Sequence, residues 1–333
     1  MLNFKWQIIN MKKIYKIKSG LRVLKSILFD IRIPLFIGFS ITYKCNSNCF
    51  YCNIKDLESN EMNSDEILYI TDELCSIKPV KVSLSGGEPL LREELGEISR
   101  MLYKYGISHS INTNGILVPE RISDIKRANI LLSIDGDKKI NDSLRGKGSF
   151  DSVIKASEAL LKNNIPFSFT TVITKNNCDI KNLIFLLDLA KKYKTKINFQ
   201  TFYTLPGHDD LGFSAYREKL RKAISYLIIM KKKGLPINNS NVSLKKLFIQ
   251  KPFNGKCIAG NIYARRRPDG TLINCSKNSE SIPISIFDYG LKEAFMKLPQ
   301  ESSCSGCTCF GANELNSIYH LSSSAIINAI INY

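Results

Sequence analysis

Strand-like and helix-like segments alternate six times between residues 35 and about 235 of this chain. Each apolar strand-like run is followed by a segment whose apolar residues recur at helical spacing. Six such units predict an α/β fold with a parallel sheet, because parallel neighbours need a crossover connection. The expected strands are 35–42, 80–85, 109–112, 130–134, 167–173 and 196–202. The expected helices are one capped by Asn63 and Glu66, then 93–105, 122–128, 150–162, 180–193 and 215–233.

The chain divides into four expected parts. Residues 1–34 predict a basic amphipathic helix, residues 35–240 the α/β domain, and residues 251–310 a small domain that is rich in cysteine and turns, with little helical periodicity. Residues 311–333 predict a closing C-terminal helix. Informative polar residues follow the expected strands, where parallel α/β folds place their active sites.

Ten cysteines are spread unevenly along the 333 residues. A long, lysine-rich chain with clustered thiols is unlike the short secreted domains that depend on disulfides. No run approaches the ~18 apolar residues of a membrane span, and no secretory signal is recognisable. Clustered thiols in a reducing compartment indicate metal ligands and a cytoplasmic protein. The isolated Cys75 and Cys178 are expected to be buried apolar residues.

The first cluster is Cys45-x3-Cys49-x2-Cys52, directly after the first expected strand. Three thiolates on one short loop suit an iron–sulfur cluster, whose usual ligands are cysteines. Three ligands for four irons leave one iron open to a substrate or cofactor. A structural zinc site prefers four closed ligands, so a zinc knuckle or an incidental cluster is the alternative.

These residues resemble the radical SAM superfamily. Its CxxxCxΦC motif is matched by Cys45, Cys49, Tyr51 and Cys52, and its GGEP motif by Gly86, Gly87, Glu88 and Pro89. Further segments at strand ends resemble those that bind S-adenosylmethionine (SAM), and they contribute Asn112, Asn114, Ser133, Asp135 and Arg145. A guanidinium such as that of Arg145 suits the SAM carboxylate.

The resemblance covers about residues 35–235 and implies a partial (β/α)6 TIM-like barrel. It implies that Cys45, Cys49 and Cys52 are the catalytic cluster ligands and that the other quoted residues bind the cofactor. The implied reaction is reductive cleavage of SAM to a 5′-deoxyadenosyl radical, which abstracts a hydrogen atom from the substrate. The cofactor carries the difficult step, while the protein positions the substrate.

The second cluster contains Cys257, Cys275, Cys304, Cys307 and Cys309. Pro268-Asp269-Gly270 is a turn signal that would fold residues 263–265 back on 272–274 and bring the flanking cysteines together. Four of these thiols suit a closed 4Fe–4S cluster, and a four-thiolate zinc site is the alternative.

This region resembles the C-terminal auxiliary-cluster domains called SPASM, with two clusters, and twitch, with one. Asn313 stands where a SPASM cysteine is expected, so one auxiliary cluster is predicted. By the twitch pattern its ligands would be Cys257, Cys275, Cys304 and Cys307. Cys309 is then either not a ligand, or it replaces one of the pair Cys304 and Cys307. A cluster with four protein ligands has no open site, which favours electron transfer and a net oxidation.

Net charge is +17, and residues 1–40 hold eight of the cations against Asp30 alone. In this segment Ile14, Ile17, Leu21, Leu24 and Leu28 follow helical spacing. The helix either packs this apolar stripe on the main domain or lies on an anionic membrane or acidic partner.

The sequence thus predicts a radical SAM enzyme of the oxidoreductase or maturase type, with two 4Fe–4S clusters and SAM. The expected substrate is a small molecule, lipid or natural product, oxidised or cross-linked with the help of the auxiliary cluster. A ribosomal peptide presented by a separate carrier is the alternative. An electron donor such as flavodoxin or ferredoxin is expected, and the cytoplasmic protein would contact the inner membrane surface if its first helix binds lipid. A zinc protein that binds nucleic acid is the alternative of another class, but no basic stripe with interleaved aromatics supports a nucleic-acid partner.

Overall fold

The computed structural model describes residues 19–57, 60–201, 213–249, 257–276, 281–300, 307 and 309–332. Its strands form one nine-stranded sheet in the order β6-β5-β4-β3-β2-β1-β7-β8-β9. Neighbours from β6 through β1 to β7 are parallel, and β8 is antiparallel to its two neighbours, β7 and β9. The strands are β1 (Phe36–Thr42), β2 (Lys81–Gly86), β3 (Ser108–Thr113), β4 (Asn129–Ser133), β5 (Phe167–Ile173), β6 (Ile197–Thr201), β7 (Tyr263–Arg266), β8 (Thr271–Ile273) and β9 (Ile284–Ser285).

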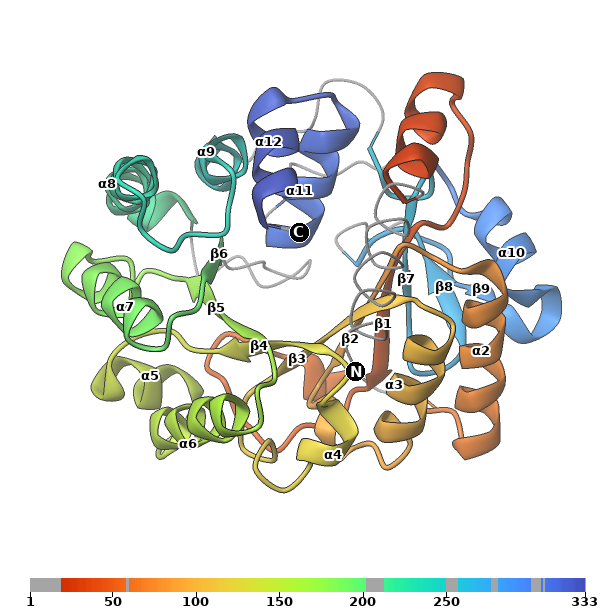
Figure 1. The fold of residues 1–333 in the computed structure, drawn as a ribbon, viewed down its shortest axis with the longest axis horizontal. Helices are drawn as coiled ribbons and strands as arrows, with labels where there is room; N and C mark the ends of the chain where they lie inside the picture. Colours follow the sequence, from red (N-terminus) through yellow and green to blue (C-terminus); the bar gives the residue numbers. More distant parts are fainter. Residues whose placement is uncertain are drawn as a thin grey trace, which may run out of the picture.

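Helices cover the convex side of this curved sheet, where α2 to α7 follow one another in Figure 1. The helices are α2 (Ser64–Ile77), α3 (Leu95–Lys104), α4 (Ile122–Ile125), α5 (Lys138–Arg145), α6 (Ser149–Lys162), α7 (Ile180–Lys192), α8 (Phe213–Lys232), α9 (Asn241–Ile249), α10 (Ile286–Lys297), α11 (Phe310–Tyr319) and α12 (Ser323–Asn332). Short 3-10 turns lie at Ile54–Asp56 and Pro89–Leu91. The predicted α/β fold, a partial (β/α)6 TIM-like barrel, is confirmed.

The hydrophobic core lies between the convex face of the sheet and these helices. Every second strand residue points into it, as Ile37, Phe39 and Ile41 do from β1. Helix α2 contributes Ile67 and Ile70, which are fully buried. The core therefore fixes the outer face of the sheet and leaves the inner face for other side chains.

Local signals explain where several elements begin and end. Helix α2 starts at the predicted capping box, in which the Asn63 side chain accepts from the backbone N–H of Glu66 and the Glu66 carboxylate accepts from that of Asn63. Gly106 follows α3 with a positive φ of 73°, a conformation that glycine adopts without a steric penalty.

The hairpin predicted at Pro268-Asp269-Gly270 is confirmed, since β7 and β8 are antiparallel with Arg265 opposite Ile273. Its first strand pairs in parallel with β1, so the cysteine-rich region continues the barrel sheet. The expectation of little helix in residues 251–310 is wrong, because α10 lies there. Its periodicity is interrupted at Gly290, whose φ of 69° is not helical.

One C-terminal helix was expected over residues 311–333, and this prediction is wrong. The structure has α11 and α12, separated at Leu321, whose φ of 55° cannot continue a helix. The amide of Ser322 turns back to the carbonyl of Ser317, which closes the first helix.

The N-terminal segment is helical over residues 19–29 and is followed by Asp30 at a φ of 52°. The predicted helix 1–34 therefore ends earlier, and its first eighteen residues, with Ile14 and Ile17, lie outside the described residues. Packing of the stripe on the main domain is wrong for its described part, because Leu21, Leu24 and Leu28 are 59%, 43% and 62% exposed. Among the described residues, no helix is long and apolar enough to span a membrane.

Candidate active site at the carboxyl edge of the barrel

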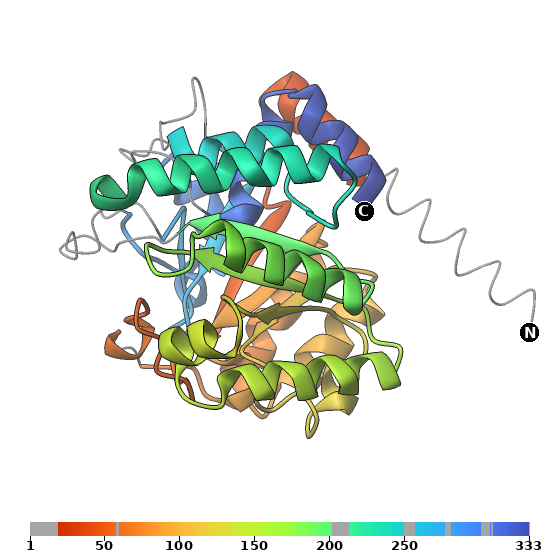
Figure 2. The ribbon, with the colours of Figure 1, turned by 90° about the vertical axis from the view of Figure 1, so that its left-hand side faces the viewer.

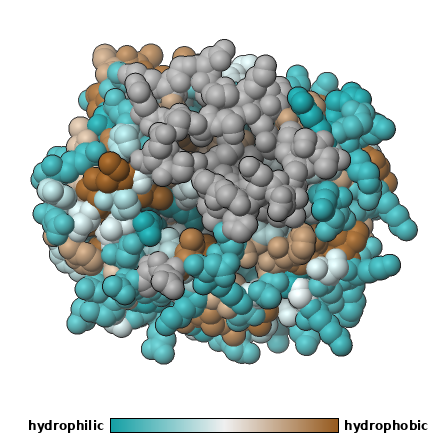
Figure 3. All heavy atoms as spheres, turned by 180° about the vertical axis from the view of Figure 1, so that it is seen from behind, coloured by the Kyte–Doolittle hydropathy of each residue, from teal (hydrophilic) through white to brown (hydrophobic). Residues whose placement is uncertain are grey.

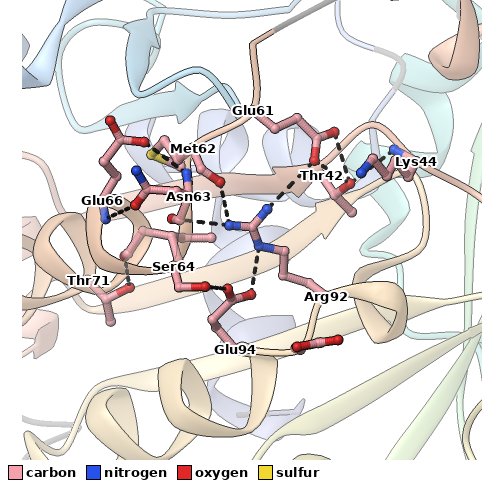
Figure 4. Close-up of polar contacts among 12 residues, drawn as sticks. Thr42, Lys44, Glu61, Met62, Asn63, Ser64, Glu66, Thr71, Arg92 and Glu94 are labelled. Atoms are coloured by element: carbon pink, nitrogen blue, oxygen red, sulfur yellow. Dashed lines mark hydrogen bonds and ion pairs between the residues drawn. The ribbon is translucent and has the colours of Figure 1, made fainter.

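The cysteine loop, residues 43–52, leaves the carboxyl end of β1 and is anchored there by Glu61. The Glu61 carboxylate accepts from the hydroxyl of Thr42 at 2.9 Å and from the amide of Tyr43 at 2.6 Å. Figure 4 shows Arg92 between Glu61 and Glu94, with ion pairs of 3.7 and 2.9 Å. The start of the loop is thus fixed by charged groups that the sequence had not singled out.

The glycines after β2 are required by the close approach of the cysteine loop. A Cβ on Gly86 would lie 2.1 Å from the carbonyl oxygen of Thr42, and one on Gly87 equally close to that of Lys44. Gly86 also has a φ of 126°, which favours glycine. The amide of Gly87 donates to Thr42, and that of Glu88 to Lys44, so the β2 end and the loop form one unit.

The Glu88 side chain joins the ends of β2 and β3. It is 1% exposed, and its carboxylate accepts from the hydroxyl of Thr113 and the amide of Asn114, both at 2.8 Å, and from the amide of Leu90. Burial raises the pKa of Glu88 to about 7, although these hydrogen bonds lower it. The structure therefore uses this carboxylate to hold neighbouring loops.

The third strand reaches the cysteine loop through Asn114. Its amide donates to the Asn46 side chain at 2.8 Å and to the Ser47 hydroxyl at 2.9 Å. Asn112 points to the inner face instead, where its amide donates to Ser83 at 3.3 Å. The two predicted asparagines thus lie near each other in sequence but serve different places.

A buried ion pair joins the fourth strand to the cysteine loop. Arg145 on α5 lies 2.7 Å from the carboxylate of Asp135, and the Tyr51 hydroxyl donates to the same carboxylate at 2.5 Å. The guanidinium is 4.0 Å from the sulfur of Cys49 and lies over the Tyr51 ring. Burial alone would lower the pKa of Arg145, but the charge of Asp135 raises it overall. Burial also raises the pKa of Tyr51, which keeps its hydroxyl a donor.

Asp135 is fully buried, and its second carboxylate oxygen accepts from the amide of Val172 at 2.9 Å. Asn177 and Asn182, which the sequence reasoning missed, both donate to its carbonyl oxygen. The sequence feature that could have identified them is their position after the fifth strand, since polar residues also follow the other strands. Ser133, two residues earlier, is half-buried and lies opposite Thr170.

The loop carries its three thiols within electrostatic reach of one another. Burial raises the pKa of Cys45 and of Cys49, the latter against the lowering effect of Arg145, and the neighbouring thiols raise both further. Cys45 and Cys49 are half-buried and Cys52 is exposed. Three neighbouring thiols on one loop, with the Arg145 guanidinium beside Cys49, suit an iron–sulfur cluster, whose ligands are thiolates.

No three His, Cys, Asp or Glu side chains in the described ranges are close enough to hold a single metal ion. Beside Cys45 the surface has an open depression of about 830 Å³. It is lined by Tyr43 and Lys44 on one side and by Lys55, Asn60 and Glu61 on the other. A molecule that approaches Cys45 from solvent therefore meets two lysines.

The second group of cysteines converges beside β7. The neighbouring thiols of Cys309, Cys275 and Cys257 add to the effect of burial, which raises the pKa of Cys307. The predicted ligand Cys304 lies outside the described residues. Cys75 and Cys178 are buried among apolar side chains, as predicted.

The comparison with known families matches residues 39–187 to the model described as the radical SAM superfamily. An AdoMet-dependent heme synthase of Methanosarcina barkeri is 32% identical over 183 residues, which cover 52% of this chain and 51% of that protein. A GTP 3′,8-cyclase of Campylobacter jejuni is 32% identical over 185 residues, which cover 52% of this chain and 57% of that protein. The chain thus spans about half the length of these curated relatives.

Solved structures share the fold over most of the chain. Streptococcus suis SuiB bound to S-adenosylmethionine superposes with a TM-score of 0.68 at 18% identity. The matched region covers 91% of this chain and 78% of the SuiB chain. Native anSMEcpe with bound AdoMet has a TM-score of 0.64 at 16% identity, with 90% of this chain and 100% of its own covered. The cysteine motif at the carboxyl edge of the parallel barrel lies within residues 39–187, which form a radical SAM domain.

Proposed function

We propose that this chain reductively cleaves S-adenosylmethionine and uses the resulting radical to abstract a hydrogen atom from its substrate. Members of the superfamily use SAM and a 4Fe–4S cluster. The observation that carries the proposal is the convergence of Cys45, Cys49 and Cys52 with the Arg145–Asp135 pair at the carboxyl edge of the sheet. When bound, a 4Fe–4S cluster held by Cys45, Cys49 and Cys52 would supply the electron that cleaves SAM.

The side chains of the site divide into ligands and positioning residues. Cys45, Cys49 and Cys52 hold the cluster, and Arg145 compensates negative charge beside Cys49. Asp135 fixes the guanidinium and the Tyr51 ring, because its carboxylate is occupied by protein donors. Its proposed part is therefore positioning rather than direct contact with SAM.

Groups for SAM itself come from the loops that follow β2, β3 and β4. The backbone of Gly86 and Gly87 and the side chain of Asn114 lie at this edge, and Asn112 and Ser133 contribute from the inner face of the sheet. Glu88 acts through its hold on Asn114. This assignment rests on the strand ends that these residues share and on the resemblance to the family.

The test is anaerobic purification followed by electron paramagnetic resonance of the dithionite-reduced protein. We expect a 4Fe–4S signal that changes when SAM is added, because SAM binds the open iron. Cys49→Ala should abolish this SAM-sensitive signal, whereas Cys75→Ala, which alters a buried thiol in the core, should keep it. A spectrum that is insensitive to SAM would contradict the proposal.

A second 4Fe–4S cluster is proposed at Cys257, Cys275, Cys304 and Cys307. The mutual influence of the described thiols of this group supports it. Cys309 is the alternative fourth ligand, and zinc is the alternative metal. In a Cys45/Cys49/Cys52→Ala background, about four irons should remain and should be lost with Cys257→Ala. Zinc in place of iron, by metal analysis, would overturn the auxiliary cluster, and comparing Cys307→Ala with Cys309→Ala decides the fourth ligand.

With an auxiliary cluster to accept an electron, the favoured outcome is a net oxidation or cross-link of a small molecule, lipid or natural product. Flavodoxin or ferredoxin would supply the first electron. Peptide modification is the second candidate, because the shared fold includes SuiB, which has been solved bound to its precursor peptide SuiA. Product analysis with SAM and reductant separates these substrates by mass.

Peripheral contact with an anionic membrane is also proposed, through residues 19–29. Leu28 and Phe29 are 62% and 69% exposed, and eight cations of residues 1–40 accompany this apolar stripe. Residues 19–29 and α12, which exposes Ile330, lie at the same end of the molecule in Figures 1 and 2. Hydrophobic atoms gather at the corresponding upper left edge of Figure 3. Apolar side chains with flanking cations are typical of helices that rest on anionic lipid.

Vesicle sedimentation tests this contact with phosphatidylserine-containing and neutral phosphatidylcholine vesicles. We expect binding to the anionic vesicles and about tenfold weaker binding for Leu28→Ser, because one buried leucine contributes about 1.5–3 kcal/mol. Leu161→Ser alters a leucine on α6 that is 48% exposed and should leave binding unchanged. Equal effects of the two variants would remove the membrane proposal.

A further inference from the structure

The two faces of the barrel sheet differ in chemistry. On the outer face, the aligned residues of β1 to β6 are buried and mostly apolar, as are Phe39 and Leu84. On the inner face, the pairing register aligns polar residues across seven strands. They are Ser40, Ser83, Ser85, Ser110, Asn112, Ser133, Ser168, Thr170, Asn198, Gln200 and Arg265.

Hydrogen bonds confirm that these side chains share one face. The hydroxyl of Ser110 reaches Ser83 at 3.5 Å, and on the far side Asn198 donates to the backbone and hydroxyls of β5. Nearer β7, the guanidinium of Arg265 donates to the Ser40 hydroxyl at 3.0 and 3.3 Å. Hydroxyl and amide groups therefore recur across the face, interrupted by apolar residues such as Leu131 and Val172.

The charge of this face is positive. Strands β1 to β7 contain no aspartate or glutamate, while Lys81 and Arg265 lie at inner-face positions. Among the described residues, no carboxylate lies within ion-pair distance of Arg265, and its hydrogen-bond acceptor is the neutral Ser40. By contrast, the next residue, Arg266, is buried on the outer face against the Phe39 ring.

Part of the inner face is also accessible, although Ser40, Ser110 and Asn198 are buried. Arg265, Ser83, Asn112 and Thr170 are half-buried, although they lie at the centre of the fold, whereas their neighbours on the outer face are inaccessible. Arg265 lies opposite Gly38, four residues before Thr42, where the cysteine loop begins. At ~3.3 Å per residue, about 13 Å separate the backbone of Arg265 from the loop, and its guanidinium extends toward the loop as far as Ser40.

We propose that the inner face binds a small-molecule substrate through a phosphate or carboxylate group, with Arg265 as the specificity-determining residue. Arginine holds such oxyanions through two parallel hydrogen bonds, and the surrounding hydroxyl and amide groups hold the polar remainder. A substrate anchored at Arg265 places its opposite end toward the cysteine loop. The inference rests on the proposed function, whose reactive centre lies at that loop.

Isothermal titration calorimetry of the cluster-loaded protein with pyrophosphate and with malate tests the proposal and separates the two kinds of oxyanion. We expect one probe to bind and its affinity to fall at least tenfold in Arg265→Gln. Arg267→Gln is the matched control, because Arg267 loses the same charge at the β7–β8 turn, where it pairs with Asp269. Binding of neither probe, or an equal loss in both variants, would overturn the proposal.

A second measurement uses the unaltered protein and does not depend on how a variant folds. Phenylglyoxal modifies accessible arginines, and peptide mass mapping follows each of them. The bound probe should protect Arg265 and leave Arg267 reactive, whereas modification of Arg265 at an unchanged rate would contradict the proposal. The SAM-sensitive signal is recorded on the same samples. If the SAM-sensitive signal is present while Arg265 is unprotected, the oxyanion site is refuted and the proposed function stands. If the signal is missing, the proposed function is refuted.

Discussion

Replacing Asp135 with asparagine removes the only negative charge that the described structure places within ion-pair distance of Arg145. The guanidinium is 9% exposed and the carboxylate fully buried, at a separation of 2.7 Å. At an effective dielectric constant of about 20, unit charges at this distance attract by about 6 kcal/mol. Leaving one partner of a buried pair uncompensated costs about 3–5 kcal/mol, because the remaining charge cannot be rehydrated. We expect the free energy of unfolding to fall by about 3–5 kcal/mol in Asp135→Asn.

Urea unfolding followed by circular dichroism measures the change, with the slope against urea compared between variants. Asp151→Asn is the matched control, because Asp151 pairs with Lys138 and both side chains are more than half exposed. Exposed pairs contribute little, so this variant should unfold like the unaltered protein. If Asp135→Asn unfolded at the same urea concentration as Asp151→Asn, the buried pair would not hold the cysteine loop in the way we describe.

Two further perturbations probe the loops around the cysteines. Since burial raises the pKa of Glu88 to about 7, the folded state binds a proton that the unfolded state has released. The free energy of unfolding should therefore fall by about 3 kcal/mol as the pH rises from about 4.5 to 7. Urea titrations at both ends of this pH range should show the fall in the unaltered protein and no change with pH in Glu88→Gln. If the free energy of unfolding of Glu88→Gln fell with pH as much as that of the unaltered protein, the assignment to Glu88 would be refuted. Gly86→Ala should prevent stable folding or cluster assembly, because its Cβ meets the Thr42 carbonyl, whereas Gly106→Ala, with open space around it, should cost about 1 kcal/mol. Similar losses in thermal melts of both variants would show that backbone conformation alone, without the close approach, sets the requirement at Gly86.

The barrel was predictable because its signals are local. Strand β5 was predicted with its observed bounds, Phe167–Ile173, since a short β-branched and aromatic run lies between turn residues. The capping box at Asn63 fixed the start of α2 in the same way. Short helices such as α5 were missed, because eight residues provide little periodicity.

The roles of the site residues depended on long-range contacts and were harder to predict. Glu88 was expected to contact the cofactor, and that stays a prediction, but the structure shows its carboxylate holding Asn114, which is 26 residues away. Gly86 was expected to let a ligand approach, and the close neighbour that the structure shows is the carbonyl of Thr42. Sequence spacing indicated which residues gather at the edge and could not indicate their partners.

The N-terminal stripe illustrates the same limit. Helical spacing identified Leu21, Leu24 and Leu28 as one face but could not say whether that face is covered. In the structure, Ser26 is buried and the three leucines are exposed. The side of the helix that packs on the barrel is therefore the one that carries Ser26 and the partly buried Val23.

Formation of 5′-deoxyadenosine tests the central claim most directly. The anaerobic, dithionite-reduced protein is incubated with SAM, and the products are identified by liquid chromatography and mass spectrometry. We predict 5′-deoxyadenosine and methionine in equal amounts from the unaltered protein, and none above background from Cys49→Ala. Intact SAM after incubation with a cluster-loaded protein, or equal product from the variant, would contradict the account.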